Sequence, residues 1–419
     1  MVRMPKFVIS VCVLVVSLVI SWAPSAQAAK PFRLGFSMAL TGPLGPAGKA
    51  ALLAMQIWRD DVNAKGGLLG RKVELVYYDD QTKPANVPGI YAKLLDVDKV
   101  DFVVSGYGTN LIVPALPIVM ERGMAFMGLF GLDANAKFNY NNYFQIMPAG
   151  PDPVVDWSRG FFEIAAKQNP RPKTIALLSA DSEFARNAVL GARRNAKKFG
   201  IKVVYDKRYP FPGTTDFTPI LRAVKATNPD MFYVGSYPGG SVGIVKAAHE
   251  IGLKPKLFGG GMVGLQYTAI QMNLGPLLNG ITNYWFWAPE KTLQFPGIEA
   301  FLKKYQTRAP AQKLDPLGYY LPPFAYAYVQ LLGQAIEATK SFDQAKVGAY
   351  IRNNTHSTVV GDVKFGKNGE WATSRTFQVQ LQNIKGHKMI EFTKPGKMVV
   401  IYPEKFKSGT LIYPYAKAK

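Results

Sequence analysis

A short loop early in the chain carries residue types that suit the binding of a small carboxylate. The loop, Gly106-Tyr107-Gly108-Thr109-Asn110, follows an apolar run at 101–105 and precedes a helical pattern. Amides at a helix start, together with hydroxyl and amide side chains, can replace the water around a carboxylate. We therefore predict that Thr109 and Asn110 bind a ligand, and Asn110 can cap the helix at the same time.

A second pattern, Gly239-Gly240-Ser241-Val242-Gly243, matches the G-x-S-x-G motif of serine hydrolases between a strand and a helix. Ser241 comes six residues after Gly235, which is too late for the sharp turn that lifts a nucleophile off a strand end. The three histidines of the chain lie in no recognisable partner motif. A Gly-rich helix start is the simpler interpretation, and a hydrolase using Ser241 is kept as the weaker alternative.

Cofactor and metal motifs are also weak. Residues 259–264 match G-x-G-x-x-G, but dinucleotide binding needs an acidic residue about 20 positions later, where Tyr284 to Ala288 stand instead. Asp79 and Asp80 are adjacent carboxylates after a strand, which are more often surface residues or helix caps, and no H-E-x-x-H spacing occurs. We therefore expect no catalytic residue, no metal and no cofactor, which favours a binding protein over an enzyme.

The first 29 residues have the features of a cleaved secretory signal. Arg3 and Lys6 precede an apolar run, Phe7 to Ile20, which is shorter than the roughly 20 residues needed to span a bilayer. Ala26-Gln27-Ala28 offers the small-x-small pattern for cleavage. Cys12, the only cysteine, lies inside this signal. We expect a cysteine-free mature chain in the periplasm that does not span the membrane.

The net charge of +22 could indicate nucleic acid as a partner. However, the basic residues are dispersed among the helical patterns, and no basic run with interleaved aromatic residues occurs. We therefore expect no nucleic-acid partner, and we interpret the charge as a solvated surface with a mild preference for anionic solutes.

The elements that position these loops alternate between strand and helix. In the first unit, two apolar runs, Phe32 to Phe36 and Val73 to Tyr78, flank a helical pattern that ends at Lys65-Gly66-Gly67. Strand, helix and strand at this spacing form a βαβ unit, which implies a parallel sheet covered by helices. Further strands are predicted at 101–105, 125–128, 143–147, 174–179, 202–205, 231–235 and 256–259. The chain is expected to cross back between lobes at 281–287, and the runs 359–365 and 376–381 suggest a last crossing.

A break at Pro148-Ala149-Gly150-Pro151 separates two such sets of units. We predict an α/β fold of two Rossmann-like lobes with parallel sheets, joined by three crossings. Lobe 1 is expected to comprise residues 30–148 plus 281–358, and lobe 2 residues 149–280 plus 359–419. Ligands in such folds bind beyond the carboxyl ends of the strands and between lobes.

Two segments carry a family resemblance. LTGPLG after the first strand, followed by NAKGGLLGRKVELVYYDDQ, resembles the branched-chain amino-acid-binding proteins, which are type I periplasmic solute-binding proteins of ABC transporters. The resemblance runs from about Pro31 to about Tyr415. It implies capture of a small organic acid between two lobes and delivery to a membrane permease, with no bond made or broken.

The resemblance also implies site residues. Thr109 and Asn110, beside Tyr107, fall where the family holds the ligand carboxylate, and Leu129, Phe130 and Gly131 fall on a second ligand-binding turn. There, Gly131 replaces a threonine, and Phe130 is either a ligand wall or a core residue. From the second lobe, the positions that fall on ligand-contacting tyrosines of the family are Phe184 and Tyr237.

Two departures from the family bear on the ligand. Met262 falls where amino-acid binders carry a glutamate for the ligand ammonium, and Ala47 falls near a position that often carries an aromatic residue. An ammonium buried without a counter-charge costs several kcal/mol, so the resemblance favours an aromatic or 2-keto acid. The alternatives are an amino-acid binder that neutralises the ammonium through Tyr237 and water, and a ligand-sensing module, although no receptor segment follows Lys419.

Overall fold

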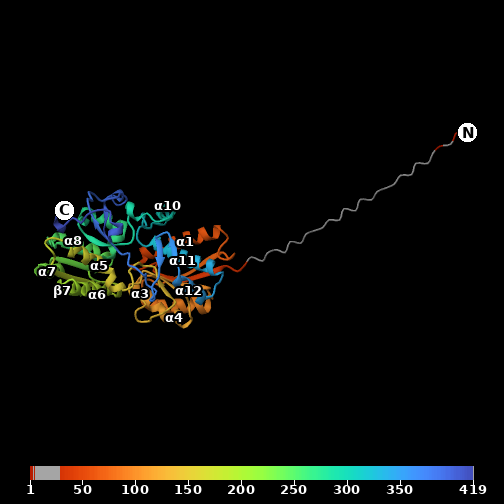
Figure 1. Cartoon of the computed structure of the whole chain (residues 1–419), viewed down its shortest axis with the longest axis horizontal. Coiled ribbons are helices and arrows are strands. Elements are labelled where there is room, and N and C mark those ends of the chain that lie inside the picture. The colour runs from red at the N-terminus through yellow and green to blue at the C-terminus, as the bar shows by residue number, and fades with distance from the viewer. Residues whose placement is uncertain (3, 5–28, 419) are drawn as a thin grey trace.

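The computed structural model describes residues 1, 2, 4 and 29–418. The predicted signal peptide, residues 1–29, therefore lies almost entirely outside the described residues. Two groups of strands and helices lie side by side in Figure 1, and the chain passes between them more than once. Within the described ranges, no helix is both long enough and apolar enough to span a bilayer.

The first lobe is built on a five-stranded sheet in which all neighbouring strands are parallel. Its strand order is β2-β1-β3-β4-β5. Helices α1 and α11 pack against each other, and α10 and α12 pack beside them. The bounds are β1 Phe32–Met38, β2 Val73–Asp79, β3 Phe102–Tyr107, β4 Phe126–Leu129, β5 Tyr143–Gln145, α1 Gly45–Ala64, α2 Val87–Ala92, α3 Thr109–Ile112, α4 Leu116–Glu121, α10 Ile298–Arg308, α11 Pro322–Thr339 and α12 Gln344–Asn353.

The second lobe is built on a seven-stranded sheet of order β14-β13-β10-β9-β8-β6-β7. Strands β6 to β10 pair in parallel, whereas β13 is antiparallel to both β10 and β14. Strands β13 and β14 follow each other in the chain and are joined by residues 382–397, and antiparallel neighbours need no crossover helix. The bounds are β6 Thr174–Ala180, β7 Lys202–Tyr209, β8 Met231–Ser236, β9 Leu257–Met262, β10 Thr282–Trp285, β13 Phe377–Leu381, β14 Met398–Tyr402, α5 Pro153–Ala166, α6 Glu183–Lys198, α7 Thr218–Ala226, α8 Pro238–Glu250 and α9 Thr268–Leu274.

Three crossings join the two sheets, at residues 146–152, 286–297 and 365–376. Before the third crossing, β11 (Thr355–Thr358) and β12 (Gly361–Lys364) form an antiparallel hairpin. Strand β10 pairs with β9 and β13 in the second sheet, although the predicted lobe boundary at 281 assigns it to lobe 1. The chain therefore crosses a few residues later than predicted, and the remaining lobe boundaries stay predictions.

The crossings are tied to each other as well as to the sheets. Trp371 Nε1 donates to the carbonyl of Ile146 at 3.0 Å. The amide of Arg375 donates to the carbonyl of Pro148 at 2.9 Å, and Thr376 Oγ1 donates to the same carbonyl at 3.2 Å. The first and third crossings are thus held together where the two lobes meet.

Candidate functional site

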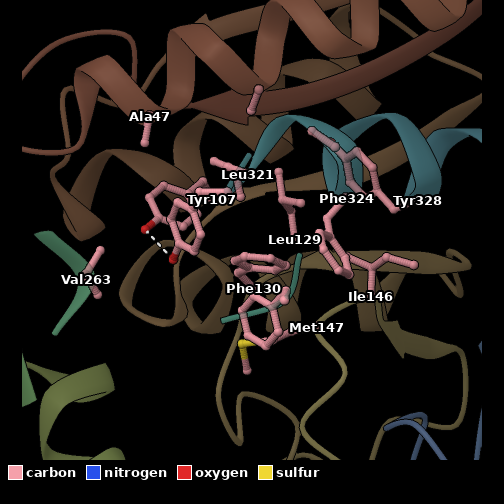
Figure 2. Close-up of a cluster of buried hydrophobic side chains, with 14 of the residues drawn as sticks. Ala47, Tyr107, Leu129, Phe130, Ile146, Met147, Val263, Leu321, Phe324 and Tyr328 are labelled. Carbon is pink, nitrogen blue, oxygen red and sulfur yellow. Dashed lines mark hydrogen bonds between the residues drawn. The ribbon is translucent and has the colours of Figure 1, made fainter. Parts of the chain in front are cut away.

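The site lies where loops after parallel strands of both lobes converge, as expected for an α/β sheet. Tyr107 ends β3 and Phe130 follows β4 in the first lobe. Tyr237 follows β8 and Val263 follows β9 in the second lobe. Figure 2 shows Tyr107, Phe130 and Val263 around the space between the lobes.

This space is a narrow cavity. The volume open to the centre of a water-sized sphere is about 20 Å³, which is room for about one water molecule. A ring-sized ligand therefore needs the lobes to move apart or the lining side chains to rearrange. The cavity is lined by Leu44, Tyr107, Gly108, Thr109, Asn110, Phe130, Met147, Trp157, Phe184, Tyr237, Val263 and Tyr320.

The polar groups of the first lobe gather at the start of α3. Gly108 has φ +102° and places Thr109 and Asn110 at the start of α3. The amides of Leu111 and Ile112 donate to the Gly108 carbonyl, whereas the first amides of a helix, here those of Thr109 and Asn110, have no acceptor within it. Thr109 Oγ1 accepts a hydrogen bond from the amide of Leu132 at 2.9 Å, which leaves its hydroxyl hydrogen free to donate. The buried Oδ1 of Asn110 has no hydrogen-bond partner among the described residues. These groups can receive a polar ligand atom.

Aromatic rings form the wall beside these groups. The hydroxyls of Tyr107 and Tyr320 lie 3.2 Å apart, and Tyr284 donates to the Tyr320 hydroxyl at the same distance. Phe130 meets Tyr320 edge to face, with ring centroids 5.4 Å apart. Such rings stack on a flat ligand, while phenol hydroxyls reach its polar atoms.

The second lobe contributes a matching aromatic wall. Phe184 meets Trp157 edge to face at 5.5 Å and Tyr237 at 6.0 Å. Tyr237 stacks on Phe211 at 4.2 Å, and its hydroxyl lies 3.0 Å from Ser182 Oγ. These contacts fix the Tyr237 ring beside the cavity and keep its hydroxyl next to Ser182.

Burial keeps the phenols of the cavity protonated. Desolvation raises the pKa of Tyr107 to about 12, against the opposing effect of hydrogen bonds with Tyr320 and Tyr267. Desolvation likewise raises the pKa of Tyr237 far above its ordinary value. At neutral pH these hydroxyls can therefore donate hydrogen bonds, which suits an anionic oxygen better than a cation.

The cavity lining contains no Asp, Glu, Lys, Arg or His side chain. Met262, which falls where amino-acid binders of the family carry a glutamate, is fully buried at the end of β9. Its amide donates to Asn283 Oδ1 at 2.9 Å, and its carbonyl accepts from Asn283 Nδ2 at 3.1 Å. The residue that lines the cavity from this turn is Val263. Met262 therefore does not line the cavity in this structure, because its side chain is buried at the end of β9, and its role in ligand binding stays a prediction.

The structure brings six of the ten predicted site residues together in the lining. The other four lie behind it. Ala47 is buried on α1, as Figure 2 shows, and Leu129 is buried within β4. Gly131 lies against Gln145, whose Nε2 donates to its carbonyl at 2.8 Å. The six residues in the lining are Tyr107, Thr109, Asn110, Phe130, Phe184 and Tyr237.

Several lining residues were not predicted. Tyr320 comes from the segment before α11 and Trp157 from α5, so neither follows a strand of a βαβ unit. Met147 comes from the first crossing. Because these residues lie outside the loops that follow strands of βαβ units, the βαβ pattern does not predict them, and their size and aromatic character are only a weak indication of a ligand site.

Ser241 is held in a buried hydrogen-bond network at the start of α8. It lies in the first turn of α8 and is fully buried. Its Oγ lies 2.8 Å from Ser236 Oγ, donates to the Tyr237 carbonyl at 3.0 Å, and accepts from the amide of Gly264 at 3.1 Å. This network fits the Gly-rich helix start favoured from the sequence.

Two α/β lobes that close on an aromatic cavity define a two-lobed ligand-binding protein. The profile of the periplasmic binding protein family matches residues 31–388. The chain therefore belongs to the periplasmic binding protein family, whose members are binding proteins of the periplasm.

Known proteins agree with this assignment. Leu/Ile/Val-binding protein homolog 7 of Brucella melitensis is 24% identical over 388 residues, which cover 91% of this chain and 94% of that protein. A solute-binding protein of an ABC transporter from R. palustris, solved with benzoate, has TM-score 0.72 at 17% identity and covers 91% and 98% of the two chains. LivJ from Streptococcus pneumoniae, solved with isoleucine, has TM-score 0.72 at 18% identity and covers 89% and 100%. The solved structures share the type I periplasmic binding protein fold.

Proposed function

We propose that this protein is the solute-binding component of an ABC importer of the branched-chain amino-acid type. It captures a small organic carboxylate between its lobes and delivers it to a membrane permease. We favour an aromatic or 2-keto acid as the ligand. The protein acts in the periplasm after cleavage of its signal, and it catalyses no reaction.

One observation carries the choice of ligand: the cavity lining has aromatic rings and hydrogen-bond donors but no acidic side chain. A carboxylate can be held by the amides of Thr109 and Asn110, the Thr109 hydroxyl and the Tyr107 phenol, which can all donate. A flat ring can pack between Phe130 and Trp157, from opposite lobes. An α-ammonium would lose its water without gaining a counter-charge, at a cost of several kcal/mol.

The comparisons support this class of ligand without selecting one compound. Some structural neighbours were solved with benzoate or 4-hydroxybenzoate, and another with isoleucine. Several relatives carry names that refer to leucine, isoleucine and valine. An amino acid is therefore the second candidate, with its ammonium held through Tyr237 and water.

A calorimetric panel of matched pairs separates the two candidates. Phenylalanine is compared with 3-phenylpropanoate and phenylpyruvate, and leucine with 4-methyl-2-oxopentanoate; benzoate is titrated alone. We expect each amine-free acid to bind more tightly than its amino acid, by at least about tenfold, since each tenfold corresponds to about 1.4 kcal/mol. If leucine or phenylalanine binds more tightly than every amine-free acid, the choice of ligand is wrong while the transport role stands.

A further inference from the structure

A second cavity lies away from the cleft, beside the crossings between the lobes. We call it the hinge groove and define it by Phe295, Gly361, Lys364, Trp371, Arg375, Tyr402, Lys405 and Phe406. The volume open to the centre of a water-sized sphere is about 770 Å³, against about 20 Å³ in the cleft. It can admit a ring-bearing molecule without any movement of the lobes.

The groove is cationic. Lys364, Arg375 and Lys405 line it, against the single carboxylate of Asp362. Asp362 accepts a hydrogen bond from Ser357 Oγ at 2.6 Å, and no salt bridge joins it to a basic residue in the described part of the chain. The carboxylate of Asp362 acts on Arg375 through space, but one carboxylate faces three cations, so the groove keeps a net positive charge.

Arg375 is the central cation. Its guanidinium carbon lies 4.7 Å from the ring centroid of Phe295 and 4.6 Å from that of Trp371. One terminal nitrogen donates to the carbonyl of Val360, while Nε is enclosed and has no acceptor among the described residues. Burial lowers the pKa of this guanidinium to about 10, and the group stays charged at neutral pH.

The conformation of the chain makes room for this arginine. Gly361 has φ +85°, and a Cβ there would stand 2.9 Å from Arg375 Nη1. A side chain at this position would therefore press on the guanidinium. Lys364 and Lys405 are exposed at the rim; Lys364 donates to the carbonyl of Asn353 at 2.9 Å and keeps other N–H groups for a ligand.

We propose that the hinge groove is a second binding site, which takes a small aromatic anion. Its ring lies against the aromatic walls, including Tyr402 and Phe406, and its negative group lies toward Arg375 and the two lysines. Stacked rings and a groove with a net positive charge recognise a flat anion by cation–π, stacking and charge-assisted contacts. The proposal concerns a site separate from the cleft and does not depend on the cleft ligand.

The test is ¹⁹F NMR of protein labelled with 5-fluorotryptophan, using 2-naphthoate as the anion and 2-naphthamide as its neutral counterpart. Trp371 lines the hinge groove and Trp157 lines the cleft. Trp371→Phe and Trp157→Phe assign the two resonances. We expect naphthoate to shift the Trp371 resonance saturably and naphthamide to shift it much less.

The double variant Lys364→Gln/Lys405→Gln removes the rim charges, and we expect it to weaken naphthoate binding at Trp371 by about three- to tenfold. The control Lys207→Gln/Lys254→Gln removes the same charge from exposed positions elsewhere and should leave binding unchanged. The proposal is wrong if naphthoate leaves the Trp371 resonance unmoved, if naphthamide shifts it equally, or if the two double variants behave alike.

Discussion

Installing a carboxylate in the cleft should reverse the ligand preference. Val263 lines the cavity from the second lobe and is 2% exposed, so Val263→Glu places an acid among rings and hydroxyls. An ammonium about 4 Å from this acid gains about 4 kcal/mol at an effective dielectric constant of 20. The carboxylate of a ligand is repelled in the same field.

The measured quantity is the ratio of the Kd of phenylalanine to that of 3-phenylpropanoate, by calorimetry at pH 7.5. We expect Val263→Glu to shift this ratio toward phenylalanine by at least about 100-fold, or about 2.7 kcal/mol, after allowing for desolvation of the new acid. Val263→Gln has the same size without the charge and should leave the ratio close to that of the wild type.

A melting curve recorded by circular dichroism first shows that both variants are folded. The reasoning is refuted if the Glu and Gln variants give the same ratio. It is also refuted if the wild type already prefers phenylalanine. The wild-type cleft would then already contain a group that compensates the ligand ammonium.

Two further predictions concern a cleft tyrosine and a pair of neighbouring carboxylates. Tyr237→Ala removes a ring that stacks on Phe211 at 4.2 Å, so we expect at least about tenfold weaker binding of the preferred acid with an unchanged fold; unchanged affinity in calorimetry would exclude Tyr237 from the site. Desolvation raises the pKa of the buried Asp80 to about 6, so the folded state holds this proton more tightly than the unfolded state, and stability falls as pH rises from about 4 to about 6. Asp80→Asn should flatten urea-derived stability across that window. Asp79→Asn should flatten it much less. The charge of Asp79 contributes to the raised pKa of Asp80, but burial is the larger cause, and hydrogen bonds from Thr41 and nearby amides lower the pKa of Asp79 itself against its burial.

Much of the fold was predictable because its elements have local signatures. The apolar runs that predict β1 and β6 begin at the residues where those strands begin. Strand β14 was missed, although Met398–Tyr402 is a run rich in β-branched residues between Gly396 and Pro403. Strand β14 pairs with β13 in an antiparallel arrangement. The βαβ pattern predicts parallel neighbours only, so it does not indicate this pairing.

The site was predictable only where it follows the ends of strands. Thr109 and Asn110 lie at such an end, and their residue types alone indicate donors. Tyr320 reaches the cavity from the segment before α11 and Trp157 from α5, through the packing of one lobe on the other, which no local pattern encodes. Met262 is the last residue of β9 and Val263 follows it, and it is Val263 whose side chain lines the cavity, which residue types alone do not indicate.

The hydrogen bonds between the crossings affect how the cleft can open. Pro148 accepts from both Arg375 and Thr376, and Ile146 accepts from Trp371. We therefore expect two of the three connections to move together when the lobes open, so that the lobes rotate about a common axis. The same segment reaches the cavity, because Met147, between Ile146 and Pro148, lines it, so we expect opening of the lobes to move this side chain directly.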